Sequence, residues 1–104
     1  MLPTDVPFAD FGEVVEIAED DDFVNARAYS DGLIVEMDPQ MQRELIAEKY
    51  QIVGHDNEGF EAEIFFARGS ETVGTIQMRD GPCEGIVTLL LTYTSPEKKK
   101  ADDE

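Results

Sequence analysis

Strict alternation of apolar and polar residues occurs most clearly in one stretch of the chain, and it predicts a β-strand. Between residues 60 and 66 every second side chain is apolar, a period that places one face of a strand in a core and the other in solvent. The predicted inward set is Phe60, Ala62, Ile64 and Phe66, and the predicted outward set is Glu61, Glu63 and Phe65.

Further runs rich in β-branched, aromatic or aliphatic residues predict additional strands at 13–18, 23–29, 33–37, 72–78 and 86–93. Asp31-Gly32 lies between the second and third of these runs and predicts a tight hairpin, because an Asp-Gly step tolerates the positive φ angles of such turns. The last run is continuously apolar, which predicts a central strand buried on both faces. Glycine-containing turns join the last three strands of the chain, so these strands are expected to form an antiparallel meander.

One amphipathic helix is predicted between the early and late strands. Asp38 and Pro39 form a typical start, with aspartate as the N-cap and proline at the first helical position, where its missing N–H costs nothing. Apolar residues then recur on one helical face, so the helix is expected at about 39–50, before a polar loop at 54–59. The predicted class is therefore α+β, mainly β: an antiparallel sheet of five to six strands forming a small sandwich or barrel with one α-helix.

The chain of 104 residues is long enough for one hydrophobic core, which predicts a single β-rich domain at 13–95. Residues 1–12 are expected to form an N-terminal arm, and residues 96–104 a disordered charged tail. The amino terminus lacks the basic and apolar regions of a signal peptide, and no run approaches about 20 apolar residues, so neither secretion nor a membrane span is expected. Cys83 is the single cysteine, which excludes an internal disulfide and favours the cytoplasm.

The strongest compositional signal is acidity. Aspartate and glutamate number 24 against 8 lysines and arginines, and the formal net charge is -16. Such a field repels nucleic-acid phosphates and anionic membranes, so direct binding to either is not expected and a protein partner with a basic surface is favoured. Three explanations stay open: solubility and steering during assembly, mimicry of nucleic acid toward a basic protein, and adaptation of an ordinary domain to a high-salt, halophilic cytoplasm.

The sequence contains no familiar catalytic or cofactor motif. There is no phosphate-binding glycine loop, zinc-protease motif or nucleophile elbow, and the glycines at 54, 59, 69, 74, 81 and 85 are interpreted as turn residues at strand ends. His55, beside Asp56 and Glu58, defines one alternative, a small metal-dependent enzyme, although a lone histidine supplies one ligand where a zinc site needs three or four. The acidic run 19–22 lacks the spacing of a calcium loop. We therefore expect no enzyme activity, no cofactor and no metal site.

Contact residues for a protein partner are expected on the arm, on the acidic loop and on the outward face of strand 60–66. Exposed aromatic side chains are frequent binding hot spots, and carboxylates attract a basic surface. For Phe65, burial under a second packed layer is the alternative. The expected contact residues are Phe8, Phe11, Asp20, Asp21, Asp22, Glu61, Glu63 and Phe65.

Near the two ends of the chain stand the segments Phe8-Ala9-Asp10-Phe11-Gly12-Glu13-Val14-Val15 and Asp80-Gly81-Pro82-Cys83-Glu84-Gly85-Ile86-Val87-Thr88-Leu89. Together with the early hairpin, they resemble the ends of small tailed-phage head-tail joining proteins, also called head completion proteins. The resemblance implies a β-rich virion assembly protein that docks in a ring between portal and tail through its arm and loops, with no catalytic residue and with oligomers formed on assembly.

The acidity alone supports a different class, a small inhibitor or immunity-type protein. Its carboxylates would imitate DNA phosphates and block a basic nucleic-acid-binding partner. The residues expected to make these contacts are Asp20, Asp21, Asp22, Glu61 and Glu63.

Overall fold

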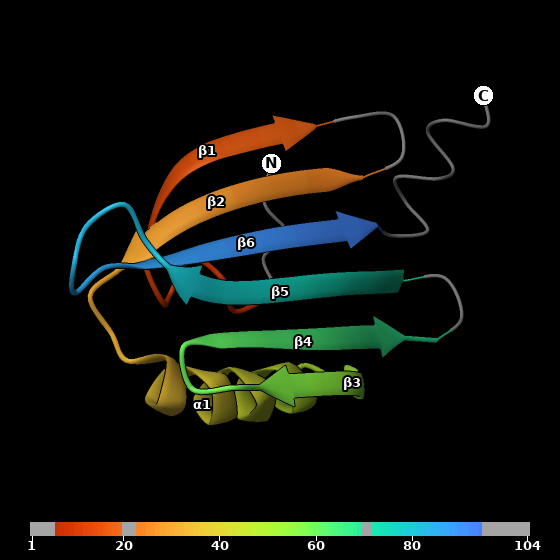
Figure 1. The fold of residues 1–104 in the computed structure, drawn as a ribbon. Coiled ribbons are helices and arrows are strands. Elements are labelled where there is room, and N and C mark those ends of the chain that lie inside the picture. Colours follow the sequence, from red (N-terminus) through yellow and green to blue (C-terminus); the bar gives the residue numbers. More distant parts are fainter. Residues whose placement is uncertain (1–5, 20–22, 70–71, 95–104) are drawn as a thin grey trace.

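Six strands and one helix make up the part of the chain that the computed structural model describes, which is residues 6–19, 23–69 and 72–94. All six strands pair antiparallel in one sheet (Figure 1). The expected class, mainly β within α+β with a single helix, is confirmed, but the described strands form one sheet, which is neither closed into a barrel nor packed on a second sheet as in a sandwich. In chain order the elements are β1 (Glu13–Glu19), β2 (Val24–Ser30), α1 (Ile34–Ala47), β3 (Gln51–Asn57), β4 (Glu61–Arg68), β5 (Thr72–Asp80) and β6 (Val87–Thr94).

The strands lie in the order β1-β2-β6-β5-β4-β3. Consecutive hairpins join β3 to β6, which confirms the meander predicted for the last three strands, and β2 pairs with β6 to attach the β1–β2 hairpin. The outermost strands each carry an irregularity in register, between Val14 and Glu16 in β1 and between Ile52 and Gly54 in β3. A bulge twists an edge strand away from regular pairing, so both edges are poor templates for a further strand.

One face of the sheet carries the hydrophobic core. On this face α1 packs against β3 and β4, behind the sheet in Figure 1, and the N-terminal segment contributes Val6 and Phe8 to the same core. The inward set predicted for 60–66 is confirmed except for Phe60, which precedes β4 and is 61% exposed. The core residues of the sheet follow the two-residue period of a pleated strand, and they are Ala26, Ala28, Ala62, Ile64, Phe66, Ile76, Met78, Val87, Leu89, Leu91 and Tyr93.

The predicted boundaries of the helix and of the hairpin before it are wrong. The segment 33–37 is not a strand, because α1 begins at Ile34 and the turn after β2 leads directly into the helix. Ile34 and Met37 are both buried and lie three residues apart, a helical spacing that the apolar alternation in this segment also fits. Asp38 is therefore not an N-cap, and Pro39 lies inside the helix, where its missing N–H removes one i→i−4 hydrogen bond.

Most of the loop predicted at 54–59 is the edge strand β3. The helix predicted at about 39–50 ends earlier, because α1 ends at Ala47 and Lys49 takes the left-handed conformation with φ 74°. The chain enters β3 two residues later, so a short turn joins the helix to an edge strand that the pattern did not predict.

Two glycines interpreted as turn residues lie inside strands. An aromatic ring lies over each of them, which explains why these strand positions have no side chain. A Cβ at Gly54 in β3 would come within 3.0 Å of Cδ2 of Phe65, and a Cβ at Gly74 in β5 would come within 2.3 Å of Cζ of Phe66. Phe65 and Phe66 are adjacent in β4 and point to opposite faces of the sheet. Each face of the sheet thus has one glycine that makes room for a ring.

β6 is central, as predicted, but it is buried on both faces only near its start. It pairs with β2 and β5, and its inward residues Leu89 and Leu91 are buried. Of its outward residues, Thr88 is buried, Leu90 is half-buried and Thr92 is exposed. The acidic loop at 20–22 and the predicted tail at 96–104 lie outside the described residues. Within the described ranges no helix is long and apolar enough to cross a membrane.

Candidate protein interface

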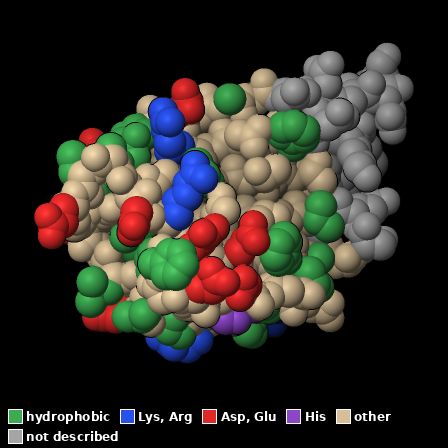
Figure 2. All heavy atoms as spheres, viewed as in Figure 1, with side chains coloured by type: hydrophobic (Ala, Val, Ile, Leu, Met, Phe, Trp, Pro, Cys, Tyr) green, Lys and Arg blue, Asp and Glu red, His purple; other side chains and the backbone are tan. Residues whose placement is uncertain are grey.

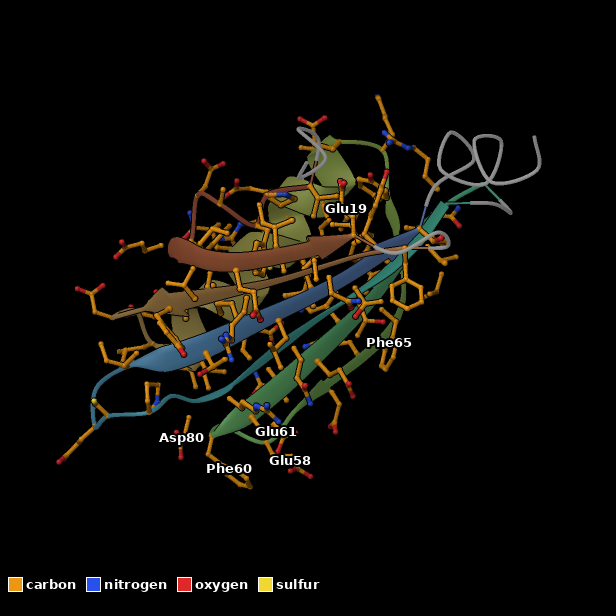
Figure 3. All side chains as sticks on the ribbon, turned by 90° about the horizontal axis from the view of Figure 1, so that it is seen from above. Glu19, Glu58, Phe60, Glu61, Phe65 and Asp80 are labelled. Atoms are coloured by element: carbon orange, nitrogen blue, oxygen red, sulfur yellow. The ribbon has the colours of Figure 1, made fainter. Side chains whose placement is uncertain are left out.

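In the part of the chain that the structure describes, no element lies over the sheet face opposite α1 (Figures 1 and 3). We call this surface the outer face and define it on the four inner strands by the residues that alternate with the core positions. They are Asn25, Arg27, Tyr29, Glu61, Glu63, Phe65, Ala67, Val73, Thr75, Gln77, Arg79, Thr88, Leu90, Thr92 and Thr94.

A small apolar group lies on the outer face around Phe65. Phe65 is 39% exposed and Val73, on the neighbouring strand, is 46% exposed. The ring of Phe65 lies against the bare backbone of Gly54 on the edge strand, an arrangement in which an aromatic side chain covers a glycine that has no side chain of its own. A ring positioned in this way loses little conformational freedom on binding, which is a property of interface hot spots.

Carboxylates border the apolar group. Glu63 precedes Phe65 by one outward position on β4, and its register partner on β3 is Asp56, which also points to the outer face. Like charges placed directly opposite each other across a strand pair repel, so a cation bound there would relieve an unfavourable interaction. Glu61 accepts a hydrogen bond from Nε2 of Gln77 at 3.3 Å. Figure 2 shows acidic side chains gathered over the β3 and β4 part of this face.

The other half of the outer face is closer to neutral. Arg27 on β2 has its Nη2 atom 3.5 Å from Oε1 of Glu16 on β1, and its guanidinium carbon is 5.9 Å from the centre of the Tyr29 ring. Arg79 on β5 is exposed and is the register partner of Glu61 on β4. The negative charge of the outer face that no basic register partner offsets is therefore that of Glu63 and Asp56, beside Phe65.

The turn between β3 and β4 extends this surface. The backbone N–H of Glu58 donates to the carbonyl of Glu61 at 2.8 Å and closes the turn, and Phe60 protrudes from it. In Figure 3 the side chains of Glu58, Phe60 and Glu61 lie together at one end of β4, with Phe65 farther along the strand, all on the side away from α1. Phe60 is an exposed aromatic residue that the alternation rule assigned to the core, and its place at the start of the strand explains the error.

Three predicted contact residues come together on β4, namely Glu61, Glu63 and Phe65. No second layer covers Phe65 among the described residues, so the alternative of complete burial is wrong for this residue. The acidic loop residues at 20–22 lie outside the described ranges.

The two aromatic residues predicted as contacts on the N-terminal arm belong largely to the interior. Phe8 is 1% exposed and is part of the core, so its side chain is not available to a partner, and the expectation for this residue is corrected. Phe11 is partly buried and packs against the same core. The physical reason is that residues 6–12 cover the part of the inner face that α1 does not reach.

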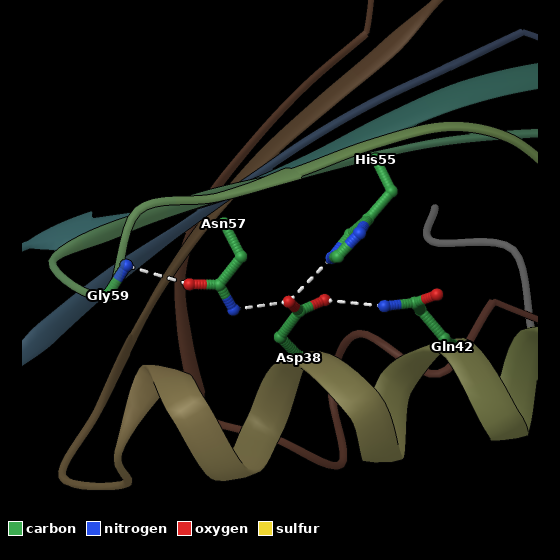
Figure 4. Close-up of polar contacts among 5 residues, drawn as sticks. All are labelled: Asp38, Gln42, His55, Asn57 and Gly59. Atoms are coloured by element: carbon green, nitrogen blue, oxygen red, sulfur yellow. Dashed lines mark hydrogen bonds and ion pairs between the residues drawn. The ribbon is translucent and has the colours of Figure 1, made fainter.

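The surroundings of His55 hold the helix on the sheet. His55 projects from β3 toward α1, where its Nε2 lies 2.7 Å from Oδ2 of Asp38 (Figure 4). Asp38 is 1% exposed and also accepts hydrogen bonds from Nε2 of Gln42 at 2.9 Å and from Nδ2 of Asn57 at 2.5 Å. Three side-chain donors satisfy this buried carboxylate. Sequence reasoning missed the cluster because it placed Asp38 at a helix end and His55 in a loop.

Within the described ranges, His55 has no partners with which it could form a metal site. No group of three or more His, Cys, Asp or Glu side chains is placed there so that it could hold a metal ion. His55 and Asn57 both bind Asp38, and Oδ1, the oxygen of the Asn57 amide group, accepts a hydrogen bond from the backbone N–H of Gly59 at 2.8 Å. The geometry therefore points to the outer face as the candidate site.

Fold and site together define a mainly-β domain with a single open sheet, one face of which is packed, whereas no element of the described residues covers the other. No protein-family model, no curated protein and no solved structure matches this chain.

Proposed function

We propose that this protein is a non-enzymatic binding module whose outer face binds a protein with a basic, amphipathic surface. The observation that carries the proposal is the position of Phe65, a half-exposed ring that lies over Gly54 and next to Glu63 on a sheet face that no element of the described ranges covers. An aromatic anchor surrounded by charged groups is the usual composition of a binding hot spot and its rim.

Charge selects the class of partner. The chain carries a net charge of -16, and the outer face adds the facing carboxylates Glu63 and Asp56 beside the anchor. Nucleic acids and anionic membranes are repelled by such a surface, whereas a basic protein gains from fast, electrostatically steered association. The apolar group around Phe65 requires that the partner also offers an apolar patch.

Two biological settings are compatible with such a module. In the first, the chain is a virion assembly protein of the head-tail joining kind, and the outer face contacts an assembly neighbour; the sequence resemblance supports this setting. In the second, the chain is an acidic inhibitor that covers the basic site of a nucleic-acid-binding protein; the carboxylates on β3 and β4 support it. The identity of the captured partner distinguishes the two.

The experiment compares the intact chain with two double variants as affinity baits in extract from the natural source. The test variant, Phe65→Ser with Val73→Ser, removes the exposed apolar residues of the outer face. The control variant, Leu33→Ser with Ile46→Ser, removes two apolar residues that are more exposed than Phe65 and Val73 and lie at the ends of α1. Each captured protein is then purified and its dissociation constant is measured against all three baits over a salt series.

The proposal expects a basic partner that binds the intact chain and the control, and whose dissociation constant rises at least about tenfold with the test variant. The dissociation constant should also rise steadily with salt, because part of the attraction is between exposed charges. A partner that binds the test variant as tightly as the intact chain, or whose affinity is insensitive to salt, would contradict the proposal.

A further inference from the structure

A hollow lies at the end of the sheet where β1 begins and β2 ends. It has a volume of about 350 Å³ and is open on one side. The residues that line it include two aromatic residues, Phe11 and Tyr29, the aliphatic Ile86 and two acidic residues, Glu13 and Asp31.

The hollow is continuous with the outer face. Tyr29 belongs to that face, and Glu13 is its register partner on β1, so the two side chains stand next to each other on the same side of the sheet. A protein seated on the outer face can therefore contact these two residues of the hollow. Phe11, which precedes β1 and packs in part against the core, also lines the hollow.

The chemistry of the walls selects an organic cation. Aromatic rings attract cations through the negative charge of their faces, and two carboxylates add a direct attraction. None of the described residues that line the hollow carries a positive charge. An anion would be repelled, and a metal ion would find two carboxylates where it needs a larger set of ligands. A guanidinium group suits such a lining, because it is planar, stacks on rings and forms paired hydrogen bonds with carboxylates.

The neighbouring residues already show one such contact within the chain. The guanidinium carbon of Arg27 is 5.9 Å from the centre of the Tyr29 ring, and Nη2 of the same residue is 3.5 Å from a carboxylate oxygen of Glu16. This internal pair combines a ring with a carboxylate around an arginine, which is the combination that the hollow offers to a second, external arginine.

We propose that the hollow binds an arginine side chain of the partner and so anchors the partner at one end of the outer face. The inference rests on the proposed function for the partner protein that carries the arginine. The affinity of the hollow for a guanidinium group, however, is a property of this chain alone. It can be measured without the partner.

The probe is arginine amide, and the matched probe is citrulline amide, which has nearly the same shape but a neutral head group. Binding is followed by the backbone amide signals of the ¹⁵N-labelled chain at low salt. We expect saturable shifts at Glu13, Tyr29 and Asp31 with arginine amide, with a dissociation constant on the order of 1 mM, and no saturable shifts with citrulline amide.

The test variant is Glu13→Gln with Asp31→Asn, and the control is Glu36→Gln with Glu48→Gln, which changes the net charge equally but on α1. The test variant should weaken the binding of arginine amide by at least about fivefold, and the control by less than about twofold. Equal weakening by both variants, or equal shifts with citrulline amide, would overturn the inference, because binding would then reflect net charge or shape alone.

The outcomes also separate this inference from the proposed function. If arginine amide binds as expected and the Phe65→Ser, Val73→Ser variant keeps full affinity for the partner, the arginine site is supported and the proposed interface is wrong. If the partner loses affinity with that variant and arginine amide does not bind at the hollow, the interface stands and the anchor is wrong.

Discussion

The two faces of the sheet are built from alternate residues of the same strands, yet they differ in nearly every physical respect. Phe66 points inward, is 1% exposed and packs edge-on against Tyr50, with ring centres 5.0 Å apart. Phe65, the residue before it, points outward and is 39% exposed. The inner face accounts for the stability of the fold, because it buries the apolar surface. The outer face is not needed for that purpose, so its apolar and acidic residues are available for binding.

The largest effect on folding is expected from the pair of phenylalanines themselves. Phe66→Ala should lower the free energy of unfolding by about 3–5 kcal/mol, because it leaves a cavity in a packed core. Phe65→Ala should lower it by less than about 1 kcal/mol, because the ring is partly solvated in the folded state. Urea denaturation followed by circular dichroism measures both. Equal losses for the two variants would contradict the assignment of the faces.

The Asp38 cluster gives the next largest difference. Asp38→Ala should lower the free energy of unfolding by about 2–3 kcal/mol, because it leaves the donors of His55 and Gln42 without their buried acceptor. The control is Asp56→Ala, an exposed carboxylate on the outward side of the same strand that His55 occupies. Its effect should stay within about 0.5 kcal/mol. The same denaturation measurement applies, and an unchanged stability in Asp38→Ala would show that the cluster does not hold the helix on the sheet.

The two glycines beneath aromatic rings sharpen the comparison further. Gly74→Ala should lower the free energy of unfolding by about 1–3 kcal/mol, because the buried Phe66 ring has no space into which it can move. Gly54→Ala should change it by less than about 1 kcal/mol, because Phe65 can swing toward solvent. Gly54→Ala should instead weaken partner binding, since it displaces the anchor. Thermal unfolding and partner affinity, measured on the same samples, test whether Gly74→Ala mainly lowers stability and Gly54→Ala mainly lowers affinity. A larger stability loss for Gly54→Ala than for Gly74→Ala would contradict this expectation.

The smallest effect is expected from the ion pair on the outer face. Glu16→Gln removes the charge opposite Arg27 and keeps the size of the side chain. Since both partners are substantially exposed, the free energy of unfolding should change by less than about 0.5 kcal/mol. Denaturation at low and at high salt checks this value. A loss above about 1 kcal/mol at low salt would place part of the stability of the fold on the outer face.

The sequence was a good guide to the strands and a poor guide to the region between them. Period-two alternation identified β4 and its faces, because burial on one side of a sheet requires that pattern. The segment 33–37 fits both a strand and a helix, and the Asp-Pro step that normally starts a helix lies inside α1. Glycine is typical of turns, so the sequence pattern assigns Gly54 and Gly74 to turns. Their presence within strands is explained by the aromatic rings that lie over them, which leave no room for a side chain.

The candidate site was predictable in part for the same reason. Glu61, Glu63 and Phe65 follow from the alternation in a single strand. The facing carboxylate of Asp56 and the contribution of Tyr29 to the hollow depend on pairing between strands distant in sequence, which no local pattern contains. Phe8 lies in a segment whose composition is typical of an exposed arm. Its burial depends on the part of the inner face that α1 leaves uncovered.

The central claim is that the outer face is covered by a partner, and hydroxyl-radical footprinting tests it most directly. Oxidation of Phe65 is compared between the purified chain and the same chain in extract from its natural source, and each value is normalised to the exposed Leu33 near α1. The account predicts that Phe65 is oxidised in the purified chain and becomes several-fold less reactive in the extract, while the buried Phe66 is unreactive in both. Equal reactivity of Phe65 in the two samples would contradict the claim that this face is where the protein binds.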